Sequence, residues 1–293
     1  MNFSRYRTFF LIVSSVTLVS LYSITFLVHG GFARSIAFDG GIRFSLIMPP
    51  GSGRAELETA VTKAGLQDFQ VKSANPGANV FDLEFGPDIR DKMTTEEIET
   101  KFLPLVEGLT PESIVSRETI DASYGADLFY IAMRSLVLAL ILIGIYLTFR
   151  FDFPYAVGAS AALIPDITMA VGFIGLMQIQ PSIPVVAAVL TIVGYSINDT
   201  IVIFDRIRAN VEDTGRLTVG ESMDTAITQT VSRTVVTSLS TLLVVVALLF
   251  GGATSLYDFA LVLLFGVVVG TYSSIFVASP VVQMYARFRE RSK

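Results

Sequence analysis

Long apolar runs separated by short polar stretches fill the second half of the sequence, and one more such run lies near the N-terminus. They cover residues 9–28, 131–149, 154–177, 184–204, 233–250 and 258–279. An α-helix of about 20 apolar residues crosses the hydrocarbon core of a bilayer, which is roughly 30 Å thick. The pattern therefore predicts a membrane all-α bundle of six helices.

The first run allows a second interpretation, because Arg5 and Arg7 precede it as basic residues precede the core of a cleaved signal peptide. The run is longer than the roughly 7–15 apolar residues of such a core. Residues 29–34 also make a poor cleavage site. We therefore expect residues 1–29 to form a cytoplasmic N-terminus and an uncleaved first membrane helix.

Residues 30–127 follow the pattern of a water-soluble domain. Strand patterns cover residues 42–47, 69–71, 80–85 and 113–120, and helical spacing covers residues 55–64 and 95–106. The order β-α-β-β-α-β predicts an inserted α+β domain of the ferredoxin-like (split βαβ) type. Because that fold hosts many functions, it locates a binding surface without naming a ligand.

Lysine and arginine positions orient the helices. These residues lie near the N-terminus, at Arg150, in the loop of about residues 205–232 and in the C-terminal tail, whereas the loops 178–183 and 251–257 contain none. Cytoplasmic loops carry the excess of positive residues. We expect both termini and loop 205–232 in the cytoplasm, residues 30–127 in the periplasm, and helices two to six within residues 128–293.

Composition supports a membrane location and excludes several functions. Hydrophobic residues make up 52% of the chain and charged residues 16%, below the roughly 25% charged residues of soluble domains. The chain has no cysteine and one histidine, His29, which excludes thiolate sites and histidine clusters. A net charge of −5 and the lack of a phosphate-binding loop give no basis for a nucleic-acid or nucleotide partner. We expect no bound cofactor.

Three charged residues within the predicted membrane helices are candidate functional groups: Asp166, Asp199 and Arg233. Charges at that depth are costly and by default mark functional sites. Asn198 and Asp199 share a polar stripe on the fourth helix, and Arg233 opens a second stripe on the fifth. If these helices are neighbours, burial favours the neutral form of Asp199 and the guanidinium favours its charged form, so this carboxyl group can exchange a proton.

Structural interpretations of the same residues stay open. Asp199 and Arg233 could form a static bridge, or Arg233 could extend to the lipid headgroups. Asp166 follows Pro165, which lacks a backbone donor, so Asp166 could hydrogen-bond at a kink or take part in proton transfer.

Two further patterns predict helix packing. Gly266, Gly270 and Ser274 lie four residues apart and predict close approach of a neighbouring helix. Within loop 205–232, apolar residues at helical spacing between Val219 and Val231 predict a helix that lies at the membrane surface or against a partner.

Four segments together resemble the SecF members of the SecD/SecF family, in the resistance-nodulation-division superfamily. They are Phe-Asp-Gly-Gly at residues 38–41, Gly-Tyr-Ser-Ile-Asn-Asp-Thr-Ile-Val-Ile-Phe-Asp-Arg-Ile-Arg at 194–208, Ser-Arg-Thr at 232–234 and Gly-Thr-Tyr-Ser-Ser-Ile at 270–275. The resemblance covers nearly the whole chain in order, and the long second segment is the most specific part of it.

The resemblance implies a non-enzymatic subunit of the bacterial inner membrane. Such a subunit pairs with SecD beside the SecYEG channel, with YajC and YidC as further partners, and uses the proton-motive force to help draw exported polypeptide outward. The resemblance places Asp199 and Arg233 at positions implicated in proton flow. Asp166 matches the acid of the third span, but Pro165 stands where many members have a histidine.

Two other functions fit a six-helix membrane protein with a small inserted domain. One is a half-module of a proton-driven exporter of small molecules or lipids, although such exporters usually carry larger domains and a second six-helix repeat. The other is a scaffold that only assembles SecD and carries no protons.

Overall fold

The computed structural model describes residues 6–33, 36, 40–75, 79–120, 122–214, 219–251 and 256–282. The chain divides into two compact units. The membrane unit comprises Met1–Ala33, Arg134–Gln180 and Pro184–Lys293, and the sheet unit comprises Arg34–Met133 and Pro181–Ile183. Parts of the patterns considered above lie outside the described residues, namely Arg5, residues 38 and 39 of the Phe-Asp-Gly-Gly segment, residues 215–218 of loop 205–232 and the C-terminal tail.

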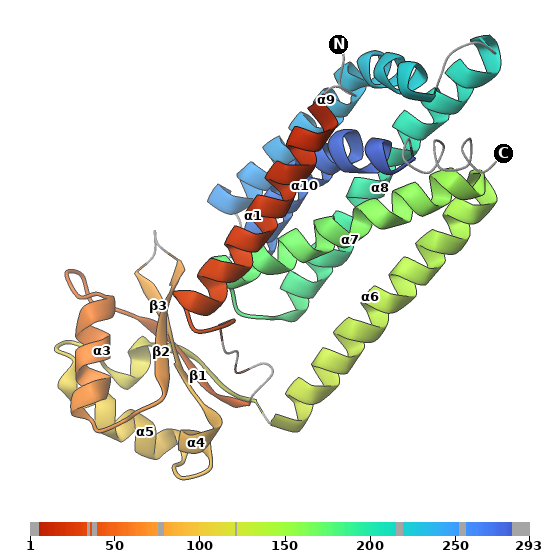
Figure 1. The fold of residues 1–293 in the computed structure, drawn as a ribbon. Coiled ribbons are helices and arrows are strands. Elements are labelled where there is room, and N and C mark those ends of the chain that lie inside the picture. The colour runs from red at the N-terminus through yellow and green to blue at the C-terminus, as the bar shows by residue number, and fades with distance from the viewer. Residues whose placement is uncertain are drawn as a thin grey trace. The chain divides into compact units, whose positions relative to one another are not determined.

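The part of the chain that the structure describes contains six helices that are long and apolar enough to cross a membrane, which confirms the predicted number (Figure 1). They are α1 (Arg7–Leu27), α6 (Ala122–Arg150), α7 (Phe153–Leu176), α8 (Ile183–Thr214), α9 (Val219–Gly251) and α10 (Tyr257–Ser273).

Helices α8 and α9 are longer than the apolar runs that predicted them. Helix α8 continues to Thr214, and the helix expected separately within loop 205–232 is the first part of α9. The apolar face of that segment packs within the chain, because Met223 and Ile227 are buried in one cluster with Phe204 of α8. The expected contact with a membrane surface or a partner is therefore not needed to bury this face.

Helix α10 lies very close to α8, as the small residues of the last span predict. A Cβ atom on Gly266 would lie 2.1 Å from side-chain atoms of Ile192, and one on Gly270 would lie 3.1 Å from the Cβ of Ser196. At position 266 only glycine permits this distance between the two helices, and at position 270 a larger residue would require a small shift. Helix α10 then passes into a π-helical turn, Ser274–Ala278.

The sheet unit contains an antiparallel sheet of four strands in the order β2-β3-β1-β4. The strands are β1 (Gly41–Ile47), β2 (Phe69–Asn75), β3 (Val80–Phe85) and β4 (Ile114–Ile120), and the helices are α3 (Arg54–Lys63), α4 (Pro87–Arg90) and α5 (Thr95–Phe102). The α5 helix begins with a capping box between Thr94 and Glu97. Only α4 and the short 3₁₀ turns were not expected from the sequence.

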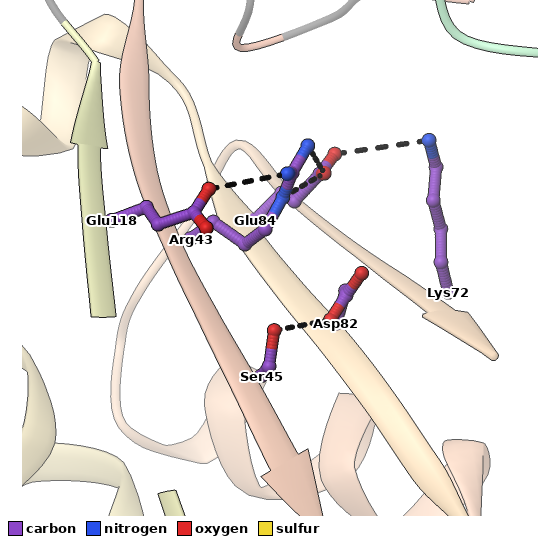
Figure 2. A network of polar contacts seen from close by, with 6 residues as sticks. All are labelled: Arg43, Ser45, Lys72, Asp82, Glu84 and Glu118. Atoms are coloured by element: carbon purple, nitrogen blue, oxygen red, sulfur yellow. Dashed lines mark hydrogen bonds and ion pairs between the residues drawn. The ribbon is translucent and has the colours of Figure 1, made fainter. Parts of the chain in front are cut away.

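The two faces of the sheet differ because side chains alternate along each strand. Phe44 is fully buried with Leu57 of α3 and Phe102 of α5 in an apolar core. The opposite face carries the polar network of Figure 2. The Nη2 atom of Arg43 lies 2.8 Å from Oε1 of Glu84, and its Nη1 atom lies 3.4 Å from Oε2 of Glu118. The same figure shows Lys72 on the other side of Glu84. The Nζ atom of Lys72 lies 3.8 Å from Oε2 of Glu84, and the Ser45 hydroxyl donates a hydrogen bond of 2.7 Å to Oδ1 of Asp82.

Candidate functional site in the membrane unit

Asp166 joins three helices of the membrane unit. It lies near the middle of α7, its side chain is 1% exposed, and its Oδ2 atom accepts hydrogen bonds from Ser196 of α8 and from Ser273 of α10, the latter at 2.7 Å. Its Oδ1 atom is buried and has no hydrogen-bond partner among the described residues. Helix α7 continues without a break through Pro165. The hydrogen bonds that Asp166 accepts come from two neighbouring helices.

Consecutive residues of α10 contact different helices around this carboxylate. The contacts are Gly270 against Ser196 of α8, Thr271 with Ser238 of α9 at 2.8 Å, Tyr272 with the Phe10 carbonyl of α1 at 2.7 Å, and Ser273 with Asp166 of α7. Of these four residues, only Gly270 was predicted to pack against a neighbouring helix, because serine, threonine and tyrosine give no signal of their distant partners.

Asp199 is buried on α8, with a side chain that is 3% exposed. Its Oδ2 atom has no hydrogen-bond partner in the part of the chain that the structure describes. Arg233 of α9 is close enough to interact electrostatically with Asp199, although its own side chain is exposed. Among the described residues, no ion pair within 4.0 Å joins the two. The two residues are therefore neighbours that do not form a closed bridge.

The polar stripe predicted on α8 divides between two environments. Asp199 points inward, whereas Asn198 and Thr191 are exposed on the surface of the chain. Tyr195 is half-buried, and its hydroxyl has no hydrogen-bond partner. On α9, Ser240 is exposed like Arg233. Polar groups therefore lie on the surface of helices that are otherwise apolar enough to face lipid.

Buried polar atoms without partners are concentrated in the membrane unit. In the part of the chain that the structure describes, these side-chain atoms belong to Asp166, Tyr195, Asp199, Ser222 and Thr234, all on α7, α8 or α9. Nearly all buried polar groups in proteins have a hydrogen-bond partner, so these atoms indicate a place for water or for another chain. The described residues include no group of three or more His, Cys, Asp or Glu side chains that could hold a metal ion.

Side chains of the long motif in residues 194–208 join the end of α6 and the interior of α9 to α8. Arg150 of α6 forms an ion pair of 2.6 Å with Asp205 of α8. Arg206 donates a hydrogen bond of 2.6 Å to Gln229 of α9. No structural role was predicted for Asp205 or Arg206 from the sequence. The opposite charges of Arg150 and Asp205 were the one available signal.

Comparison with known proteins identifies relatives over nearly the whole chain. The family model described as "Protein export membrane protein SecD/SecF, C-terminal" matches residues 104–288. A "Protein translocase subunit SecF" from Borreliella burgdorferi is 33% identical over 96% of this chain and 95% of its own length. One from Vibrio alginolyticus is 36% identical over 83% of this chain and 76% of its own length.

A solved structure is also similar. The crystal structure of SecDF, a translocon-associated membrane protein from Thermus thermophilus, matches with a TM-score of 0.85 and 32% identity over 98% of this chain. This chain spans 39% of that longer protein.

Proposed function

Because this chain belongs to the SecD/SecF family of protein-export membrane proteins, we propose that it is an accessory subunit of the Sec protein translocase. Its relatives are named as translocase subunits, and we assign it no covalent catalysis. It acts with SecD beside the SecYEG channel, in contact with YajC, YidC and the translocating polypeptide. The proton-motive force supplies the energy.

A SecD partner would complete this chain in two respects. The SecDF relative from Thermus thermophilus is a longer chain of which this one covers 35%, and SecD would supply the remainder. In addition, Asn198, Arg233 and Ser240 are exposed on membrane helices, where contact of polar side chains with lipid is costly. Helices of SecD that cover these residues would remove that cost.

The environment of Asp199 is the observation that carries the energetic part of the proposal. A closed ion pair with Arg233 would hold the carboxylate permanently charged, whereas a carboxylate without any cation nearby would stay neutral. The structure has Arg233 near Asp199 with no bridge, and one carboxylate oxygen has no partner. Such a group can change protonation state as neighbouring helices move. Asn198 and Asp166 contribute further polar groups along this route.

The location of the parts follows from the charge distribution. We propose a multi-pass protein of the bacterial cytoplasmic membrane with both termini in the cytoplasm and residues 30–127 outside it. We also infer that the sheet unit is ferredoxin-like, which its strand order β2-β3-β1-β4 and its helices α3 and α5 support.

The variant Asp199→Asn tests this function because it keeps the shape of the side chain and removes its exchangeable proton. Membrane vesicles would contain the chain together with SecD and SecYEG, and export would be measured with and without a proton gradient. We expect basal export to persist and stimulation by the gradient to fall at least tenfold. Asp88→Asn, the same change at an exposed residue of α4, should behave like the wild type.

The other outcomes of this experiment identify the alternatives. Normal stimulation of export in Asp199→Asn would favour an assembly scaffold. Intact secretion with loss of small-molecule efflux would favour an exporter.

A further inference from the structure

The hydroxyl of Ser273 has two acceptors and only one proton. Its Oγ atom lies 2.7 Å from Oδ2 of Asp166 and 3.1 Å from the carbonyl oxygen of Gly270. A serine hydroxyl donates a single hydrogen bond at a time, but it can also accept one. Ser273 can therefore donate to Asp166, or donate to Gly270 while it accepts a hydrogen bond from Asp166.

These two arrangements correspond to the two protonation states of Asp166. When the carboxylate is charged, Ser196 and Ser273 both donate to Oδ2. When Oδ2 carries a proton, that proton is donated to Ser273, and the proton of Ser273 turns to the Gly270 carbonyl. Ser196 continues to donate to Oδ2, which keeps acceptor capacity in the acid form. The heavy-atom positions therefore suit both states without loss of a contact between helices.

The groups around Asp166 supply no compensating charge. From α8 and α10 it is faced by the hydroxyls of Ser196 and Ser273. On α1, the titratable group that contacts α7 is Tyr22, whose hydroxyl donates to the Thr168 carbonyl at 3.2 Å. Within the described residues no lysine, arginine or histidine forms an ion pair with Asp166, and Asp199, three residues after Ser196 on α8, has the same sign. A proton would neutralise this carboxylate without rearrangement of the two serine side chains.

We propose that Asp166, Ser196 and Ser273 form a second proton-binding site, separate from Asp199, in which the Ser273 hydroxyl turns between Asp166 and Gly270 as the proton binds and leaves. This inference rests on the proposed use of protons by the complex. The Gly270 carbonyl also accepts the backbone N–H of Ser274, where α10 passes into the π-helical turn. Proton occupancy at Asp166 is thereby linked to the hydrogen bonding of α10 at the start of that turn.

Infrared difference spectroscopy between acid and alkaline pH tests this site directly. The sample is the full chain reconstituted with SecD in lipid, and the signal is the carbonyl-stretch band of a protonated carboxylic acid. We expect a band that is lost in Asp166→Asn and kept in Asp199→Asn. In Ser273→Ala the band should shift to higher frequency, because the acid proton loses its acceptor.

Ser274→Ala is the matched control. This neighbouring buried serine donates only to the Thr271 carbonyl of its own helix, so its removal should leave the band in place. Ser273→Ala keeps the test decisive if Asp166→Asn does not assemble with SecD. The proposal would be overturned if Asp166→Asn lost no carboxylic acid band, if the band that Asp166→Asn removes were unchanged in Ser273→Ala, or if sodium removed that band at constant pH.

The result is independent of the test of the proposed function. If Asp199→Asn loses stimulated export while Asp166→Asn keeps every carboxylic acid band, the second site fails and the proposed function stands. If Asp199→Asn exports normally under a gradient, the proposed function fails, whatever band Asp166 gives.

Discussion

Single hydroxyl groups link residues that are far apart in the sequence. Tyr272 of α10 donates to the Phe10 carbonyl at 2.7 Å and lies 3.0 Å from Ser14 Oγ, both on α1. Each such bond contributes about 1 kcal/mol. At the residue scale, the bundle is therefore held by a few polar contacts together with apolar packing.

The variant Tyr272→Phe should lower the stability of the bundle by about 1 kcal/mol, because it removes the donor to α1 and keeps the ring. The measurement is the midpoint of thermal unfolding, followed by helical circular dichroism in detergent. Tyr146→Phe on the exposed surface of α6 is the control and should leave the midpoint unchanged. Equal effects of the two variants would show that the contact with α1 does not stabilise the bundle.

The sequence reveals some of these residues better than others. Asp166, Asp199 and Arg233 were found because a charge within an apolar run is conspicuous and costly. Ser196 and Ser273 were missed, because serine is common in membrane helices and their shared partner Asp166 lies in another helix. An interaction between Asp199 and Arg233 was predicted on the condition that their helices are neighbours, but the absence of a closed bridge depends on side-chain positions that no local pattern contains.

At the scale of elements, the periodicity of apolar residues predicted most of the structure. The six spans and the four strands were each predicted at their places in the chain, since each buries an apolar face or run, although α6, α8, α9 and β2 extend beyond the predicted bounds. Residues 205–232 were harder to assign, because polar residues at helical spacing do not show whether a helix continues or restarts. The structure has α8 extending to Thr214 and α9 beginning at Val219.

The variant Gly266→Ala should destabilise the contact between α10 and α8 by about 2 kcal/mol, because the new methyl group overlaps Ile192. Thermal unfolding in detergent measures the loss, and a second change, Ile192→Ala, should recover part of it by making room. Gly144→Ala on α6, where a Cβ atom meets nothing within 4 Å, is the control and should be neutral or slightly stabilising. A neutral Gly266→Ala would contradict the close packing of these helices.

At the scale of the whole molecule, the membrane unit exposes two kinds of surface. Helix α6 exposes a row of large apolar residues that includes Leu138, which is typical of contact with lipid. Helices α8 and α9 expose Asn198, Arg233 and Ser240 between apolar residues, which favours contact with another protein. The proposed SecD partner should therefore cover α8 and α9 and leave this face of α6 to lipid.

Single-cysteine variants test that assignment without background, because the chain contains no cysteine. Asn198→Cys and Ser240→Cys should form cross-links to SecD in native membranes, while Leu138→Cys on α6 should form none. Cross-linked products resolved on denaturing gels give the answer. Cross-links from Leu138→Cys alone would place the partner on the opposite surface.

The central claim, that Asp199 exchanges the proton that drives export, is tested most directly by recording proton influx and export together. Vesicles would contain the chain, SecD and SecYEG, with a pH-sensitive dye inside and a polypeptide in transit. We expect Asp199→Asn to abolish both the influx and the gradient-driven part of export. Influx and stimulation equal to those of the wild type would contradict the account.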